Sequence, residues 1–150
     1  MAEAWPDLGG RLTEGGHVLP VRVYFEDTDF SGRVYHAAYL KFMERGRSDF
    51  LRLIGIHHNA LAVEDRVAFA VRRMTIEFLK GASIDEVLEV ETRIASLHGA
   101  RVVVAQRVMR NGEALVTAEV MVALVDERGK PKRLSPAMQS RLGTSAPKPS

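Results

Sequence analysis

Apolar residues change their spacing once along this chain, and that change limits the folds open to it. Between His36 and Ile54 they recur every three to four residues, as on one side of an α-helix. Between Ala68 and Asp126 they largely alternate with polar residues in steps of two, as in strands with one face in water. A lone helix beside an antiparallel sheet must bury its apolar side on that sheet. The spacing therefore predicts an α+β fold in which the sheet wraps the helix.

The predicted helix has an apolar side, an internal glycine and a stop. Gly55 follows the last apolar position and predicts that the helix ends there. Gly46 lies inside the helix, where glycine costs about 1 kcal/mol relative to alanine, and a close approach to the sheet would explain it. The charged residues, Arg47 among them, are expected to point away from the apolar side. That side carries Leu40, Met43, Phe50, Leu51 and Ile54.

Five strands are predicted from runs of β-branched, aromatic and alternating residues. Pro20 lies in the first of them, so it must be near the strand start or at a sheet edge. The last four strands are expected to follow one another as a meander, and Asn111-Gly112 between the last two is a strong signal for a tight hairpin. The strands cover residues 18–25, 68–78, 88–94, 100–110 and 115–126.

Strict alternation within residues 68–78 assigns each side chain to one face of the strand. It places Phe69 and Val71 on the face opposite to Met74. It also places Arg72 and Arg73 on opposite faces, so only one of these two cations would meet a bound ligand.

The chain of 150 residues has room for one domain with one substantial core. Residues 1–17 are rich in Gly, Glu and Pro and show no periodicity, so they are predicted to form a flexible N-terminal extension. Residues 143–150 are predicted to form a flexible C-terminal tail for the same reason. The folded domain is therefore expected to cover residues 18–142.

Composition excludes several classes of function. Without any cysteine, the chain has no disulfide, no thiolate zinc site and no cysteine nucleophile. The longest apolar run is far shorter than the ~20 residues of a membrane-spanning helix, and the N-terminus lacks the pattern of a secretory signal. We therefore expect a cytoplasmic protein that does not insert into membranes. A net charge of +2 is too small to indicate nucleic-acid binding.

A turn-like segment with three acidic residues joins the first strand to the helix. It contains Glu26, Asp27 and Asp29, followed by Gly32 and by His36 at the first helical turn. Unpaired N–H groups and the positive end of the helix dipole stabilise negative charge at a helix start. A carboxylate there can work as a base or a nucleophile, and the N–H groups can hold the oxyanion of an attacked carbonyl. The alternative is an ordinary turn whose Asp and Ser side chains cap backbone groups.

Other chemistries have weaker support in the sequence. Asp27 and Asp29 could bind Mg²⁺, but two carboxylates without further ligands are a weak signal. His57 and His58 are adjacent, and adjacent side chains rarely face one metal ion. The cations within residues 128–133 indicate either a solvated turn or an anchor for a phosphorylated ligand.

Residues 24–52, YFEDTDFSGRVYHAAYLKFMERGRSDFLR, resemble the signature of the 4-hydroxybenzoyl-CoA thioesterase group of hotdog proteins. Within that group the chain is most similar to the Tol-Pal-associated acyl-CoA thioesterases, and the similarity covers about residues 18–135. The resemblance implies a hotdog fold, an antiparallel sheet of about five strands wrapped around one long central helix. It also implies hydrolysis of an acyl-CoA, with short-chain or related acyl groups, to a free acid and CoA.

The resemblance also assigns catalytic roles to Asp29 and His36. Asp29 matches the family's catalytic carboxylate, which acts either as the nucleophile or as a base for water. Gly32 matches the glycine that lets the loop turn toward the thioester. His36 falls where the helix begins, and the backbone N–H at that position polarises the thioester carbonyl. The chain departs from the usual string at three positions in this loop, Phe30, Ser31 and Arg33.

The remaining implications concern the substrate and the assembly. No metal or redox cofactor is implied, because coenzyme A enters as part of the substrate. Hotdog proteins of this type pair edge to edge, so we expect a homodimer or homotetramer with sites at the interface. The alternatives are a protein that binds acyl thioesters or acyl carrier protein in envelope or phospholipid metabolism, and another hotdog enzyme such as a dehydratase. The residues expected to bind substrate are Gly32, Arg33, Tyr35, Arg72 and Arg73.

Overall fold

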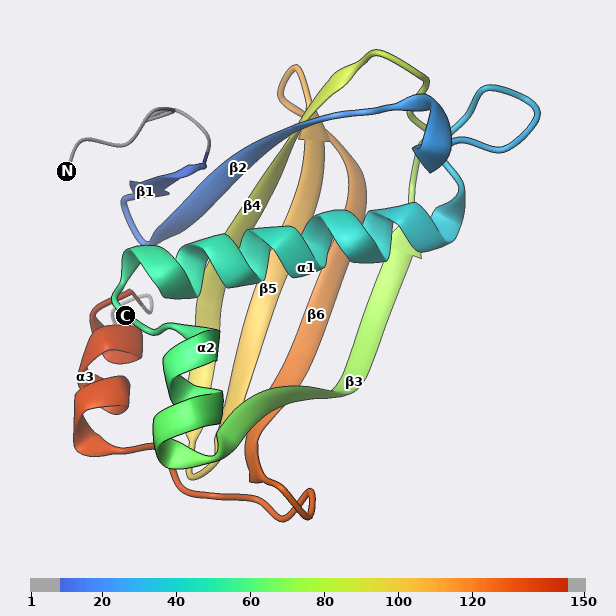
Figure 1. Ribbon diagram of the computed structural model, residues 1–150. Helices are drawn as coiled ribbons and strands as arrows, with labels where there is room; N and C mark the ends of the chain where they lie inside the picture. The colour runs from blue at the N-terminus through green and yellow to red at the C-terminus, as the bar shows by residue number, and fades with distance from the viewer. Residues whose placement is uncertain (1–8, 146–150) are drawn as a thin grey trace, which may run out of the picture.

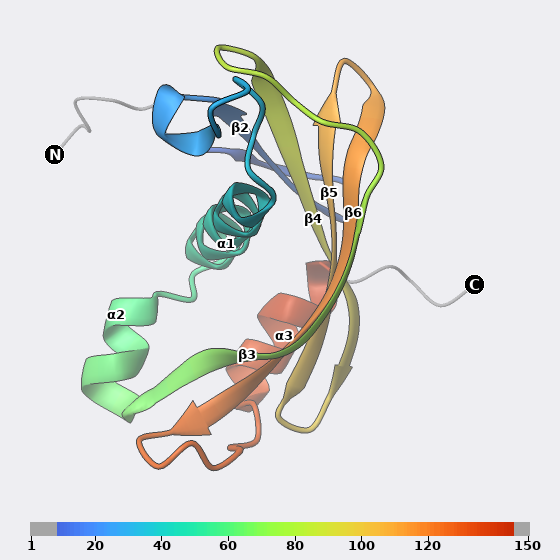
Figure 2. The same ribbon diagram turned by 90° about the vertical axis from the view of Figure 1, so that its right-hand side faces the viewer.

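Helix α1 (His36–Leu53) crosses the inner face of an antiparallel sheet, as the apolar spacing predicts (Figure 1). A view turned by 90° shows the sheet curving around the helix (Figure 2). The computed structural model describes residues 9–145. The strands are β1 (Arg11–Thr13), β2 (Gly16–Arg22), β3 (Val67–Phe78), β4 (Val87–His98), β5 (Arg101–Arg110) and β6 (Glu113–Asp126). The short helical elements are η1 (Phe25–Asp27), α2 (His58–Ala60), η2 (Leu61–Asp65) and α3 (Pro136–Ser145).

The strands lie in the order β1-β2-β4-β5-β6-β3, which differs from the predicted meander. β4, β5 and β6 do follow one another, but β3 pairs with β6 at the far edge of the sheet. The prediction was wrong because the connection from Phe78 to Val87 is long enough to cross the end of the sheet (Figure 2). β2 therefore takes the place beside β4, and β3 is left as an edge strand in the described part of the chain.

The sheet begins earlier than the predicted domain boundary at residue 18. β1 pairs with β2, and β2 starts at Gly16, so residues 11–17 belong to the sheet and not to a flexible extension. His17 is buried, and its Nε2 lies 2.7 Å from Asp49 Oδ2 of α1. Periodicity missed this part because β1 has only three residues and all are exposed. At the other end α3 continues to Ser145, beyond residue 142, while residues 1–8 and 146–150 lie outside the described residues.

A β-bulge overturns the predicted faces of β3. The register with β6 shifts between Val71 and Arg73, which leaves Arg72 as an extra residue. Phe69 and Met74 consequently both pack on the core under α1, although they are an odd number of residues apart. Arg72 and Arg73 share the outer face and do not point to opposite faces. The alternating pattern cannot predict the bulge, because one extra residue reverses the face assigned to every earlier residue of the strand.

The side of α1 that meets the sheet is only partly the predicted one. Met43 and Phe50 are buried as expected, while Leu40 is 39% exposed. Arg47 was predicted to point away and is instead buried, where its guanidinium donates to Gln106 Oε1 at 2.8 Å and to a glutamate one turn away. A charged side chain is buried only when it has such partners, and helical spacing does not reveal a partner on another strand.

Gly46 lies where α1 comes close to the sheet, as predicted from its place inside the helix. A Cβ atom there would stand 2.9 Å from Val90 Cγ1, 3.1 Å from Thr92 Oγ1 and 3.3 Å from Gln106 Nε2. The Gln106 amide also donates to the Met43 carbonyl at 2.9 Å, which ties the helix to β5. The close approach is therefore confirmed, and any larger residue at this position would push the helix from the sheet.

Three predicted turn and edge features are confirmed. Asn111 and Gly112 have φ angles of +48° and +80° and join β5 to β6 as a two-residue hairpin. Gly55 follows α1 with φ of +87°, in the left-handed region that favours glycine. Pro20 lies in β2 beyond the residues that β1 covers, so its missing N–H is at a sheet edge.

We expect Gly46→Ala to destabilise the fold by about 1–3 kcal/mol, although alanine is the better helix former. The new Cβ must displace Val90, a buried β-branched residue without a flexible end that could yield. Urea unfolding followed by circular dichroism would measure the change. In a Val90→Ala background the same substitution should cost much less, because the missing methyl groups leave room. An equal cost in both backgrounds would show that Val90 is not the obstacle.

Candidate active site

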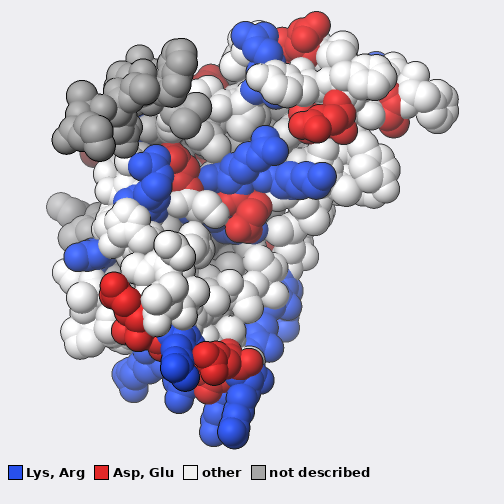
Figure 3. All heavy atoms as spheres, in the orientation of Figure 1, with Lys and Arg blue, Asp and Glu red and all other residues white. Residues whose placement is uncertain are grey.

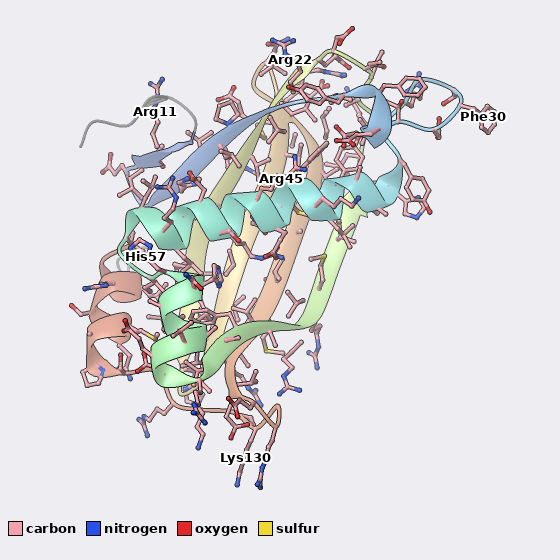
Figure 4. All side chains as sticks on the ribbon, viewed as in Figure 1. Arg11, Arg22, Phe30, Arg45, His57 and Lys130 are labelled. Atoms are coloured by element: carbon pink, nitrogen blue, oxygen red, sulfur yellow. The ribbon has the colours of Figure 1, made fainter. Side chains whose placement is uncertain are left out.

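The loop between β2 and α1 forms a short hairpin whose two arms are joined by a β-bridge. At its tip the Gly32 N–H donates to Asp29 O at 3.0 Å, and the Asp29 N–H donates to Arg33 O at 2.9 Å. Gly32 has φ of +81°, a conformation that L side chains disfavour, so this turn requires a glycine. Figure 4 shows the loop projecting beyond the start of α1, with Phe30 at its tip.

Asp29 is an exposed acid of this loop, and Glu26 is a second one. Its Oδ1 accepts a hydrogen bond from the Ser31 hydroxyl and a second from the Ser31 N–H at 2.8 Å. These bonds, the hydroxyl first, hold the pKa of the Asp29 carboxyl below its usual value. The carboxylate therefore stays charged at neutral pH, and its exposure leaves it open to a reactant.

Asp27 has a different environment and a different task. It is 8% exposed, and its Oδ2 accepts a hydrogen bond from the Tyr24 N–H at 2.9 Å. Its backbone carbonyl accepts from the Tyr35 N–H at 3.0 Å, directly before α1 begins. Asp27 thus shapes the loop, while Asp29 remains available for chemistry. Within residues 9–145 no group of three or more His, Asp or Glu side chains could hold a metal ion.

His36 is the first residue of α1, and Tyr35 before it has extended backbone dihedrals. The first N–H groups of a helix have no acceptor within the helix. The Tyr35 N–H is used by Asp27 and the Ala38 N–H by the Tyr35 carbonyl, whereas the His36 N–H has no acceptor among the described residues. An unpaired donor at the positive end of an 18-residue helix is suited to hold a developing negative charge.

The family resemblance assigns no role in this site to Ser31. It departs from the usual family string, and yet it supplies both hydrogen bonds that stabilise the Asp29 carboxylate. An Asp followed two residues later by Ser is a common pattern for a side chain that bonds to the backbone ahead of it. This pattern at Asp29 and Ser31 was the signal from which the contact could have been predicted.

The predicted substrate-binding residues fall into two groups. Gly32, Arg33 and Tyr35 lie with Asp29 and His36 on the loop between β2 and α1, and the Tyr35 and His36 ring centroids are 4.3 Å apart. Arg72 and Arg73 lie in the middle of β3 on the outer face of the sheet. The Arg72 guanidinium donates to Gly129 O at 2.9 Å, so it supports the turn after β6. A single chain therefore does not bring these two arginines to the loop.

Cations gather at the end of the molecule opposite to the loop that carries Asp29. In Figure 3 the blue side chains cluster at the bottom, over the turn that follows β6, and Lys130 marks this end in Figure 4. Lys132 lies 3.9 Å from Asp126. Among the described residues, Arg128, Lys130 and Arg133 have no ion-pair partner. Three unpaired cations on one turn suit either solvent or the phosphates of a ligand.

Comparison with known proteins places this geometry in a family. The pattern of the thioesterase-like superfamily matches residues 23–142. The chain is 46% identical over 117 residues to the acyl-CoA thioester hydrolase YbgC of Escherichia coli O6:H1, which covers 77% of this chain and 87% of that protein. It is 43% identical over 115 residues to the acyl-CoA thioesterase YbgC of Haemophilus influenzae, covering 77% and 85%. A crystal structure of a probable thioesterase from Bartonella henselae is 50% identical, with a TM-score of 0.77, and covers 80% of this chain and 99% of that one. The chain therefore belongs to the thioesterase-like superfamily and has its hotdog fold.

Proposed function

We propose that this protein is an acyl-CoA thioesterase that hydrolyses its substrate with Asp29 and the start of helix α1. One observation carries the proposal: a single loop holds an ionised carboxylate and, a short way along, a helix-start N–H without an acceptor. Acyl transfer needs these two groups, one to attack or to activate water and one to hold the oxyanion. The relatives at 43–46% identity, named as acyl-CoA thioesterase or thioester hydrolase, support the same reaction.

Two routes use the same groups. In one, Asp29 takes a proton from water while the water oxygen adds to the thioester carbonyl carbon. In the other, an Asp29 oxygen adds to that carbon, and water later cleaves the mixed anhydride. In both routes the carbonyl oxygen becomes negative beside the His36 N–H, the thiolate of CoA leaves as the carbonyl re-forms, and the thiolate then takes up a proton.

We further propose that two chains complete each site. Asp29 is exposed on a projecting loop, whereas electrostatic stabilisation works best where water is largely excluded. β3 offers a free edge of 12 residues, which soluble proteins rarely leave open. Antiparallel pairing of two β3 strands about a twofold axis would close both edges and bring each loop against the other chain. A homodimer is the smallest such assembly, and two homodimers could associate as a homotetramer.

The same pairing supports a place for the nucleotide end of CoA. β3 begins at Val67, opposite Asp126 of β6, and ends at Phe78, whose ring centroid lies 6.1 Å from that of His36. In an antiparallel pair, the Val67 end of one chain lies beside the Phe78 end of the other. The basic turn at residues 128–133 of one chain would then lie near the catalytic loop of the other. Its unpaired cations are suited to the phosphates of CoA.

The finer assignments rest on the resemblance in sequence. The carrier in this proposal is CoA, and acyl carrier protein is the alternative, because both present the acyl group as a pantetheine thioester. A cytoplasmic location is proposed from the composition of the chain, and a link to the Tol-Pal envelope system from the subfamily that the chain resembles. Neither route requires a metal or redox cofactor. None of the helices in the described part of the chain is long and apolar enough to span a membrane.

Asp29→Asn should lower kcat by about 10³-fold or more, because the amide is neither a nucleophile nor a base. The far-UV circular dichroism should not change, since the side chain is exposed. Asp27→Asn is the matched control: the amide oxygen can still accept from the Tyr24 N–H, so most of kcat should remain. Release of free thiol from an acyl-CoA measures both variants. The assignment is wrong if the Asp27 variant loses activity and the Asp29 variant keeps it.

Ser31→Ala should raise the pKa of Asp29 toward its ordinary value, because the hydroxyl is the largest cause of the lowered pKa. A raised pKa means that the carboxylate is protonated at higher pH on acidification. The acidic limb of kcat/KM against pH should therefore move to higher pH, and a ¹³C NMR titration of the Asp29 carboxyl should show the same shift. Ser48→Ala on α1 is the control and should leave both curves in place. Unmoved curves in the Ser31 variant would show that its hydroxyl does not tune Asp29.

In solution at micromolar concentration the protein should have at least twice the chain mass of 16.6 kDa. The reason is the open edge of β3, which pairing would satisfy. Multi-angle light scattering on a sizing column gives the mass, and an activity assay on each fraction links the mass to function. A fully active monomer would rule out a site shared between two chains.

A further inference from the structure

The β3–β4 connection, residues 79–86, runs beside the hairpin that carries the candidate acid (Figure 1). The Val34 N–H donates to Ala82 O at 2.9 Å, and the Ile84 N–H donates to Gly32 O at 3.2 Å. An isolated β-bridge joins the two residues that lie between these bonds. Apart from its continuation into η1 and α1, the hairpin is hydrogen-bonded within the described residues to this connection alone. The position of the hairpin therefore depends on the shape of the connection.

The side chain of Glu86 maintains that shape. Its Oε1 accepts a hydrogen bond from the Ser83 N–H at 2.6 Å, and both carboxylate oxygens lie 3.1 Å from Arg110 Nη1 at the end of β5. The same guanidinium donates to Gly81 O at 3.2 Å. Asp85 has φ of +70°, which residues with a side chain rarely adopt. Such a backbone conformation persists only where the surroundings hold it, and these hydrogen bonds on both sides of Asp85 do so.

Tyr39 ties the β3–β4 connection to the start of α1. Its hydroxyl oxygen accepts a hydrogen bond from the Ala82 N–H at 2.9 Å, and both residues are buried. Tyr39 lies three residues after His36, on the same side of the helix. Ala82 therefore uses its N–H for the helix and its carbonyl for the hairpin. The connection links the two halves of the candidate site, Asp29 on the hairpin and the first N–H of the helix.

Glu86 acts on the site only through this connection, because it makes no hydrogen bond to Asp29 or His36. Position matters for this chemistry: a misplacement of about 1 Å can lower a rate about 10²-fold, even when the change is remote from the reacting atoms. The backbone of Glu86 is held separately, since its carbonyl accepts from the Val23 N–H at 2.9 Å. Removing the carboxylate should therefore leave the start of β4 in place and loosen the connection.

We propose that Glu86 is a positioning residue, which through Arg110 and the β3–β4 connection holds Asp29 where it can act on a thioester bound at the start of α1. Tyr39 holds the same connection from the side of the helix. This inference rests on the proposed thioesterase function, because the relative position of Asp29 and the His36 N–H matters only if both act on one carbonyl group.

The test compares Glu86→Ala with Glu91→Ala, which breaks the ion pair between Glu91 of β4 and Arg107 of β5 and does not touch the connection. In Glu86→Ala, release of free thiol from an acyl-CoA should show kcat and kcat/KM lowered together by about 10- to 100-fold, because the lost geometry is needed in the transition state. Glu91→Ala should keep the wild-type kcat. Glu86→Gln retains an oxygen that can accept from the Ser83 N–H, so it should restore most of kcat.

A second measurement follows the link without catalysis. Amide hydrogen exchange observed by NMR should become faster in Glu86→Ala at Val34 and Ile84, whose N–H groups join the hairpin to the connection, and should not change in the middle of β5. Tyr39→Phe removes the acceptor of the Ala82 N–H and should speed exchange at the same amides. Its effect on kcat should not add to that of Glu86→Ala, because both changes loosen one connection.

The outcomes separate this inference from the proposed function. A wild-type kcat in Glu86→Ala, or a raised KM alone, would overturn the positioning role and leave the thioesterase standing. An equal loss of kcat in Glu91→Ala would attribute the effect to general destabilisation and would also overturn it. A protein that hydrolyses no acyl-CoA would refute the proposed function, and the exchange rates would then decide whether Glu86 holds the hairpin. If Glu86→Ala does not fold, Tyr39→Phe decides by the same two measurements.

Discussion

The close packing of α1 on the sheet at Gly46 is the contact on which the rest of the structure depends. Because glycine has no side chain, the helix backbone can approach Val90 and Thr92, and Gln106 can reach the Met43 carbonyl. Those contacts fix the helix along its axis and about it, and therefore fix where its first N–H group points. The hairpin that carries Asp29 is attached to the same end through the bond from the Tyr35 N–H to the Asp27 carbonyl. The candidate chemistry at His36 is thus positioned by packing at Gly46, 10 residues further along the helix.

The same packing has a consequence on the other side of the helix. A helix held close to β2 and β4 cannot also lie close to β3, because the sheet is wider than one helix (Figure 2). The inner face of β3 is therefore left partly exposed, with Val71 at 48% and Phe78 at 47%, and one edge of β3 is unpaired in the described part of the chain. The Arg47 side chain extends from α1 to Gln106 and occupies part of the space beside the helix. Its guanidinium is hydrogen-bonded there. Removing one partner would leave the buried guanidinium unpaired, and the loss of folding free energy would exceed what the pair contributes to stability. We therefore expect this hydrogen-bonded pair to tolerate few substitutions.

A structural feature could be predicted from the sequence when its cause lies within one helix, strand or turn. It could not be predicted when its cause lies between two of them. Helix α1 and its stop at Gly55 follow from local spacing, and the Asn111-Gly112 hairpin from local turn chemistry. The place of β3 at the far edge does not, since both edges of a sheet accept the same alternating strand. The bulge at Arg72 does not either, because nothing in the pattern marks one residue as extra. The candidate acid Asp29 and the helix start could be named from the sequence, but the hydrogen bonds from Ser31 that lower the pKa of Asp29 needed the geometry of the turn.

The exposure of Asp29 and the hydrogen bonds that it accepts belong to one argument. If a partner chain and a substrate cover the Asp29 carboxylate, as proposed, it loses water, and that loss raises its pKa and favours the protonated, inactive form. Ser31 supplies two donors that move with Asp29 on the same turn, so they remain when solvent is removed. In the single chain these two bonds lower the pKa of Asp29 below its usual value, and in the proposed dimer they would oppose the rise that the loss of water brings. Gly32 contributes to this arrangement, because its φ of +81° closes the turn in which Ser31 faces the carboxylate. In the proposed dimer, the turn would therefore keep Asp29 charged where one chain alone leaves it in water.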